Sequence, residues 1–260
     1  MARNCSKGCS AAAPFVLVAL YVLVALLWTA AVLHENARAS ENVLLHSKTT
    51  VDEAIQPAKP AKPKNLFLSM GGGDIDYFRG LLEAGADPNA AMPDTGKTPL
   101  MITEHAEIQE LLLEFGADPK LTDNRGATAL HYAVGAGDAL RMVPRLLEKG
   151  ANVNAVAQGW SQQTPFMVVS GLYFQGNDPI RCAKVMRLLS ERGADIDTVD
   201  HGGYTVLINA VVNDKPDLVR LMVELGADVD TKAKDGLSAL DWAQELGFVD
   251  IVELLESSRQ

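Results

Sequence analysis

A tripeptide, Gly-Ala-Asp, recurs through most of this 260-residue chain and limits the possible folds more than any other feature. It begins at Gly85, Gly116, Gly193 and Gly226, and the segment that begins at Gly150 is a Gly-Ala-Asn variant of it. Successive glycines are 31, 34, 43 and 33 residues apart. A period of roughly 20–50 residues indicates an array of small units, each of which buries its apolar face only against its neighbours. The tripeptide therefore predicts a stack of repeats.

Two further markers keep the same register. One is Thr98-Pro99-Leu100-Met101, echoed at residues 128–131, 164–167, 205–208 and 238–241, and the other is a pair of large apolar residues shortly before each glycine. A threonine at a helix start accepts a hydrogen bond from a free backbone N–H, and a proline directly after it lacks only a donor that would be unpaired anyway. Glycine after a helix permits the left-handed conformation that ends it. Each repeat is therefore predicted to contain two helices, followed by an extended hairpin.

Period, marker order and residue types together resemble the ankyrin repeat family, whose signature is T-P-L-H-x-A at a period of about 33 residues. The resemblance covers residues 65–260. It implies an all-α ankyrin-repeat solenoid, in which helix-turn-helix repeats carry β-hairpin fingers. About six repeats are expected, at residues 65–92, 93–122, 123–155, 156–198, 199–232 and 233–260.

The repeats are expected to be irregular. Residues 70–74 contain three glycines where a helix turn should be, which is typical of an N-terminal cap. From its threonine to its glycine, repeat two spans 18 residues, repeat five 21 and repeat four 29. This predicts a short first helix in repeat two, and about eight extra residues around residues 171–179 in repeat four. The last repeat becomes more polar on its outer side, as a C-terminal cap must.

The resemblance implies that partners bind at the hairpin tips and on the exposed side of the first helices, because ankyrin domains generally bind other proteins and share no catalytic site. The matching positions are Asp94, Thr95, Lys97, Asn124, Arg125, Trp160, Ser161, Gln163, His201, Tyr204, Lys234, Asp235 and Leu237. Trp160 and Tyr204 are the strongest candidates, because large amphipathic rings dominate binding hot spots. Packing onto the neighbouring finger is the alternative for Trp160. Tyr173 and Phe174, in the insertion, are a second candidate contact, and the alternative is that they fold back onto repeat four.

Charge is unevenly distributed along the chain. Residues 65–260 carry 16 Lys and Arg against 29 Asp and Glu, a net charge of −13, whereas residues 1–64 carry a net charge of +3. An acidic folded part argues against nucleic acid as a partner, since phosphates repel it and no counterions would be released. Long-range attraction mildly favours a basic protein partner.

Little in the sequence points to an enzyme, a metal site or a cofactor. His131 matches the structural histidine of the family, which usually braces the turn at the position of Thr128. Cys182 lies on an amphipathic stretch and is expected in the core, where a thiol is not a nucleophile. His105 and His201 have no Cys or His at metal-ligand spacing. We therefore expect a binding protein with no cofactor, no bound metal and no small-molecule substrate.

Residues 11–33 contain no charged side chain, and residues 15–33 are predominantly apolar. About 20 helical residues span the ~30 Å hydrocarbon core of a bilayer, so this segment predicts a transmembrane helix that acts as an uncleaved signal anchor. Arg3 and Lys7 indicate that residues 1–10 stay in the cytoplasm, with the repeats on the periplasmic or extracellular side. The alternative is a signal peptide cleaved after residues 37–39, an Ala-Arg-Ala site, which would release a secreted or periplasmic protein.

Residues 34–64 are expected to form a linker that ends in alternating proline and lysine, a composition that favours an extended, semi-rigid spacer. The whole sequence predicts a membrane-tethered ankyrin-repeat protein that mediates protein–protein interaction. The alternative is an exported, soluble ankyrin protein that acts as an inhibitor or immunity-type binder of an enzyme.

Overall fold

The computed structural model describes residues 66–69 and 74–259. The predicted transmembrane helix at residues 11–33, the linker at residues 34–64 and the three consecutive glycines at residues 71–73 lie outside these ranges. Within the described ranges, no helix is both long and apolar enough to cross a membrane.

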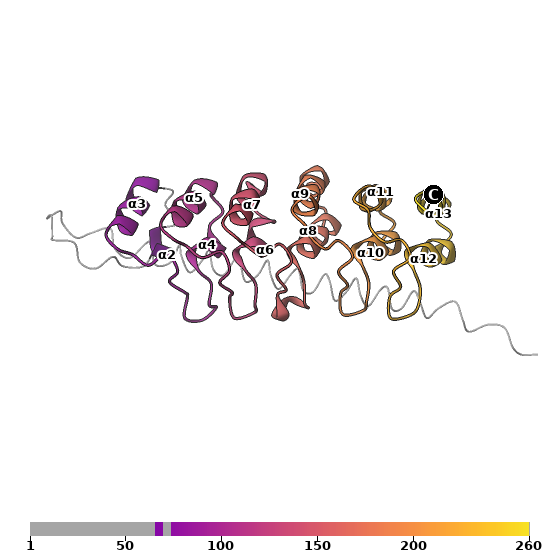
Figure 1. Cartoon of the computed structure of the whole chain (residues 1–260), viewed down its shortest axis with the longest axis horizontal. Coiled ribbons are helices and arrows are strands. Elements are labelled where there is room, and N and C mark those ends of the chain that lie inside the picture. The colour runs from indigo at the N-terminus through magenta and orange to yellow at the C-terminus, as the bar shows by residue number, and fades with distance from the viewer. Residues whose placement is uncertain (1–65, 70–73, 260) are drawn as a thin grey trace, which may run out of the picture. The chain divides into compact units, whose positions relative to one another are not determined.

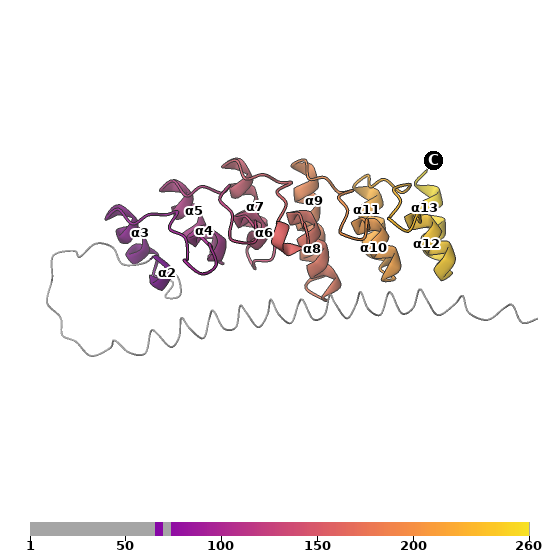
Figure 2. The ribbon, with the colours of Figure 1, turned by 90° about the horizontal axis from the view of Figure 1, so that it is seen from below.

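The described residues form a row of helix pairs that follow one another in chain order (Figure 1). The first helices of the pairs are α2 (Leu66–Ser69), α4 (Pro99–Ile102), α6 (Ala129–Ala133), α8 (Pro165–Phe174), α10 (Val206–Val212) and α12 (Ala239–Leu246). The second helices are α3 (Ile75–Glu83), α5 (Ala106–Glu114), α7 (Ala139–Glu148), α9 (Pro179–Glu191), α11 (Pro216–Glu224) and α13 (Val249–Ser257). The predicted all-α stack of helix-turn-helix repeats is confirmed. Figure 2 shows the same row from the side toward which the hairpins point.

The helix starts follow from the residues that the sequence markers place there. Thr164 and Thr205 each accept a hydrogen bond at the side-chain oxygen from the backbone N–H three residues later, at 3.4 and 3.2 Å. Proline occupies the first helical position at Pro99 and Pro165, where its missing N–H costs nothing. The N-cap role predicted for this marker is therefore confirmed in repeats four and five.

The second helices end where the Gly-Ala-Asp tripeptide begins. The five glycines that open these tripeptides and their Gly-Ala-Asn variant have φ between +84° and +89°, a region that glycine adopts at little cost and other residues do not. After each glycine, the alanine N–H returns to a carbonyl of the helix; Ala227 N–H, for example, donates to Met222 O at 3.0 Å. This bond closes the helix and turns the chain into the next hairpin.

The core lies between the helices of neighbouring repeats. In α11 the residues Leu218, Val219, Leu221 and Met222 are buried, whereas Arg220 faces solvent, as amphipathic spacing predicts. Each repeat contributes a similar apolar face, and the buried side chains of the whole row form one continuous cluster. Stability therefore comes from the contacts between adjacent repeats.

The hairpins, which we call fingers and number by the repeat that each opens, project from one side of the row. Their closing backbone hydrogen bonds enclose residues 92–97, 123–127, 157–163, 200–204 and 233–237 in fingers two to six. Fingers three, four and six each contain a single bridge instead of long strands. The bridges join Thr122 to Thr128, Ala157 to Gln163 and Lys232 to Ser238. The predicted β-hairpin fingers are thus present in a minimal form.

The irregular repeats behave as predicted in two cases. In repeat two, α4 has four residues, whereas α10 in repeat five has seven. In repeat four, the extra residues lengthen both helices, so that α8 has 10 residues and α9 has 13. The insertion is therefore absorbed into the helices and does not form a separate loop.

Candidate protein-interaction face

Neighbouring fingers are joined to each other near their tips. Asn124 N–H donates to Thr95 O at 2.9 Å, Gly159 N–H donates to Arg125 O at 2.8 Å, and Lys234 N–H donates to Gly202 O at 3.2 Å. Fingers three and four lie so close that a Cβ atom on Gly159 would sit 2.7 Å from the Arg125 Cβ atom. These bonds hold the tips of fingers two, three and four together, and those of fingers five and six together, and we call the surface that the tips form the finger face.

The finger face presents most of the residues that the sequence predicts for partner binding. Its fully exposed members are Asp94, Asn124, Arg125, Ser161, His201, Lys234 and Asp235. Those that are half-buried are Thr95, Lys97, Gln163, Tyr204 and Leu237. The exposed set combines acidic, basic and amide groups, so a partner would be recognised mainly through polar contacts.

Trp160 does not lie on the surface, contrary to the reasoning that made it a leading candidate contact. Its side chain is 8% exposed, and its ring packs edge-on against Tyr132, with 5.1 Å between ring centroids, and against His131 at 6.0 Å. The alternative, packing onto the neighbouring finger, is right that the ring is packed and not displayed, but the ring contacts are with two residues of helix α6. The indole supports finger four from beneath, because burying an aromatic side chain at a finger root is more favourable than exposing it at the tip.

Finger four has a longer and more strained tip than its neighbours. Its closing hydrogen bond joins Ala157 N–H to Gln163 O, six residues apart, whereas the equivalent bonds of fingers three, five and six span four. Ser161 and Gln162 both adopt the left-handed conformation, with φ of 56° and 60°. Two consecutive non-glycine residues in this region store strain that the surrounding contacts must offset, a feature that is concentrated at functional sites.

Tyr204 is half-buried and joins fingers five and six. Its hydroxyl donates to Asp235 Oδ2 at 2.7 Å, and its ring lies 6.4 Å from that of Trp242. Burial, and then the hydrogen bond to the Asp235 carboxylate, raise the pKa of Tyr204 to about 12. The phenol is therefore neutral at any physiological pH and acts as a hydrogen-bonded brace.

Two residues that support the finger face from below were not predicted: Tyr132 in α6 and the buried Asp123. Tyr132 donates from its hydroxyl to Asp123 Oδ2 at 2.6 Å, and the Lys97 ammonium lies 4.8 Å from the centre of the Tyr132 ring. Asp123 Oδ1 also accepts from the backbone N–H groups of Arg125 and Ala127, at 2.8 and 2.9 Å. An aspartate that opens a tight turn is a recognisable signal for such bonds, but the ring above it depends on the neighbouring helix.

Tyr173 and Phe174 are not on the finger face. They lie at the C-terminal end of α8, half-buried, with their rings edge-to-face at a centroid distance of 6.3 Å. Burial raises the pKa of Tyr173. Both side chains pack on the apolar cluster of the stack, so folding back is the alternative that the structure supports.

The side chains elsewhere that could act in catalysis or bind a metal are engaged in packing. Cys182 is 3% exposed, and burial raises the pKa of its thiol, so the reactive thiolate is disfavoured. His131 accepts at Nδ1 from the Thr128 N–H, at 3.1 Å, which confirms its bracing role. Among residues 66–69 and 74–259, no three His, Cys, Asp or Glu side chains are grouped so as to hold a metal ion.

A row of helix pairs with a pre-ordered line of polar finger tips defines a repeat scaffold of the kind that binds proteins. The sequence model described as ankyrin repeats (3 copies) matches residues 66–157 and 178–259, which is more than half of the chain, and the chain belongs to the ankyrin repeat family. The unmatched interval, residues 158–177, contains the tip of finger four and the whole of α8.

Known proteins match this chain over its repeats and are longer than the matched part. Human B-cell lymphoma 3 protein is 32% identical over 200 residues, which cover 75% of this chain and 39% of that protein. The Neurogenic locus Notch protein of Drosophila melanogaster is 37% identical over 99 residues, covering 37% of this chain and 4% of that protein. The chain thus spans well under half of the length of these relatives.

Solved structures agree on the fold. An ankyrin repeat domain from Acinetobacter baumannii AYE superimposes with a TM-score of 0.63 at 23% identity, over 74% of this chain and 96% of that one. The ankyrin repeat domain of Bcl-3 gives a TM-score of 0.61 at 27% identity, over 72% and 81%. Ankyrin repeats suggest protein–protein interaction.

Proposed function

We propose that this protein binds another protein through the finger face, and that it has no catalytic activity of its own. The proposal rests on the hydrogen bonds that join one finger to the next. They hold the tips in place before a partner arrives, so little conformational entropy is lost on binding. The strained tip of finger four, which the family model leaves unmatched, is the part of this face most specific to this chain.

The partner is expected to be basic overall. The net charge of −13 on residues 65–260 attracts a basic protein over distances of about 10 Å at physiological ionic strength. Association should therefore slow down as salt is added, because screening weakens the long-range attraction.

Variants of exposed tips test the finger face directly. The triple variant Asp94→Ala, Arg125→Ala and His201→Ala removes three exposed side chains from three different fingers. Partners that co-purify with the full chain from native membranes should be lost, while helical circular dichroism stays unchanged. A matched control, Glu114→Ala, Lys149→Ala and Arg192→Ala, removes three exposed side chains at the ends of second helices and should retain the partners. Equal capture by both variants would reject the proposal.

We also propose that residues 11–33 anchor the protein in a membrane, with residues 1–10 in the cytoplasm and the repeats on the periplasmic or extracellular side. The uncharged length of the segment supports this, since it matches the thickness of a bilayer. Carbonate-washed membranes should retain the full-length chain. A soluble mature chain that starts near Ser40 would contradict the anchor and favour the alternative, an exported ankyrin protein that inhibits an enzyme.

A further inference from the structure

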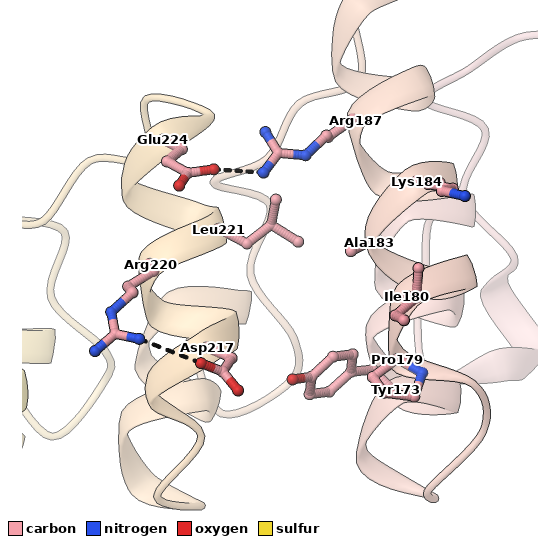
Figure 3. A pocket seen from close by; sticks show the side chains of 10 residues that line it. All are labelled: Tyr173, Pro179, Ile180, Ala183, Lys184, Arg187, Asp217, Arg220, Leu221 and Glu224. Carbon is pink, nitrogen blue, oxygen red and sulfur yellow. Dashed lines mark hydrogen bonds and ion pairs between the residues drawn. The ribbon is translucent and has the colours of Figure 1, made fainter.

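A groove of about 470 Å³ runs between the second helices of repeats four and five, α9 and α11. Tyr173, Ile180, Lys184 and Arg187 line it from α8 and α9, and Arg220 and Leu221 line it from α11. Figure 3 shows the Tyr173 ring and the Leu221 side chain pointing into the space between the two helices. The groove belongs to the second helices and contains none of the predicted finger-tip residues.

The insertion in repeat four contributes to this groove. Tyr173 lies in the part of α8 that exceeds the length of α10, and Pro179 and Ile180 form the extra first turn of α9. Second helices pack closely in the pairs α3–α5, α5–α7, α7–α9 and α11–α13, and α9 with α11 packs less closely than these. The longer helices of repeat four therefore supply one end of the groove, where α9 and α11 are less closely packed.

The groove has an apolar floor, and one exposed apolar side chain lies among the charged residues of its rim. Leu221 is buried at its floor beside the half-buried Ala183, and the Tyr173 ring closes one end. Ile180 is 68% exposed at the rim, the most exposed of the large apolar side chains among the described residues. A single exposed isoleucine is unremarkable, but one that continues into a hollow lined by leucine and tyrosine offers a contiguous surface for an apolar side chain.

The charges around the groove leave one cation uncompensated. Arg187 pairs with Glu224 across the groove, and Arg220 pairs with Asp217 at 3.3 Å along α11. Lys184, on the α9 side of the groove, is exposed and points away from α11 (Figure 3), and it forms no ion pair within the part of the chain that the structure describes. Lys184 is therefore the cation at the groove that remains available, since Arg187 has Glu224 as its partner and Arg181, outside the groove, donates to Ala136 O at 3.0 Å.

We propose that this groove binds a short segment of a partner protein that places an apolar side chain against Ile180 and Leu221 and an acidic side chain beside Lys184. We expect the segment to be acidic, because both carboxylates at the groove already have arginine partners and the charge that remains, on Lys184, is positive. From Asp217 to Glu224, α11 makes about two turns, or roughly 10 Å, which suits an apolar anchor and a carboxylate that are about one helical turn apart. This site is independent of the finger face and prefers the opposite charge.

A peptide selection tests the groove with the full chain in detergent. A random peptide library is selected on the wild-type chain and depleted on the double variant Ile180→Ser and Lys184→Glu. Both positions are exposed, so these substitutions leave the fold intact, and helical circular dichroism checks this. The enriched peptides should share an apolar residue with Asp or Glu three or four positions away.

Affinities measured by fluorescence anisotropy complete the test. Ile180→Ser should weaken binding of the best peptide by about tenfold, and Lys184→Glu should weaken it by several-fold, most strongly at low salt. Val249→Ser removes a similarly exposed side chain from α13, and the finger variant Arg125→Ala alters the other face; neither should change the affinity.

Three results would overturn the proposal. One is enrichment of basic peptides, or of none. Another is binding that is insensitive to both groove substitutions. The third is self-association in sedimentation velocity that Ile180→Ser abolishes, since the occupant would then be a second copy of the chain.

Discussion

At the scale of single residues, Gln109 is the side chain least suited to its place. It is fully buried in α5, seven residues before the glycine of its repeat, and neither amide atom has a hydrogen-bond partner. The equivalent positions of the other second helices before a marker glycine are Phe78, Val143, Met186 and Val219, all of them buried and apolar. An unpaired buried amide costs about 1–3 kcal/mol.

Replacement of Gln109 by valine should therefore stabilise the stack by about 1–2 kcal/mol, which a rise in the thermal midpoint of the full chain would show. The reciprocal substitution Val219→Gln places the same amide in a regular repeat and should destabilise it by a similar amount or more. A lower midpoint for Gln109→Val would mean that the amide has a partner, such as a buried water.

The pH dependence of stability should reveal the buried His131. Its Nδ1 accepts from the Thr128 N–H, and its Nε2–H donates to Gln163 O at 3.2 Å, so the ring is neutral. Burial is the main cause that lowers the pKa of His131 below its ordinary value of 6.5. In the unfolded chain the imidazole takes up a proton as the pH falls through 6.5. In the folded chain it stays neutral to a lower pH. Acid therefore favours the unfolded state, and the free energy of unfolding decreases as the pH falls.

We expect the loss to reach at most about 1.4 kcal/mol per pH unit below 6.5, until the pH falls to the folded-state pKa. Denaturant titrations of the wild type and of His131→Gln between pH 7 and pH 5 measure it, and the difference between the two curves cancels the contribution of the carboxylates. Parallel curves for the two proteins would show that His131 already titrates normally in the folded state.

At the scale of elements, the sequence markers predict where helices begin and end, because these limits depend on local chemistry. Threonine caps, prolines at helix starts and glycines with positive φ act within a few residues of themselves. What the markers do not predict depends on partners distant in sequence. Trp160 is buried because Tyr132 of the preceding repeat lies over it, and one end of the groove exists because the insertion lengthened two helices.

Two glycine-to-alanine substitutions test where the helices begin and end, and they should change the stability in opposite directions. Gly226 ends α11 with φ of +88°, so Gly226→Ala should destabilise the stack by about 1–2 kcal/mol. Gly80 lies inside α3, where an added Cβ atom meets nothing within 4 Å, so Gly80→Ala should stabilise it by about 0.5–1 kcal/mol. Thermal unfolding of both variants measures this, and shifts of the same sign would contradict the helix limits described.

At the scale of the whole molecule, the chain offers two surfaces of different character. The finger face is polar, pre-ordered and part of an acidic domain, whereas the groove between α9 and α11 is apolar with a positive rim. Both depend on repeat four, whose finger is longer and whose helices are extended. A scaffold with two such surfaces can hold two partners at once, and the central claim concerns the first of them.

Site-specific photocrosslinking in native membranes tests that claim most directly. A photoreactive residue is placed, one position at a time, at the exposed tips Asn124, Ser161 and His201, and at the control positions Glu114 and Arg192. We predict that the three tips form the same crosslinked adduct with one protein and that the two controls do not form it. Adducts confined to the control positions, or no adduct at any tip, would contradict a binding function of the finger face.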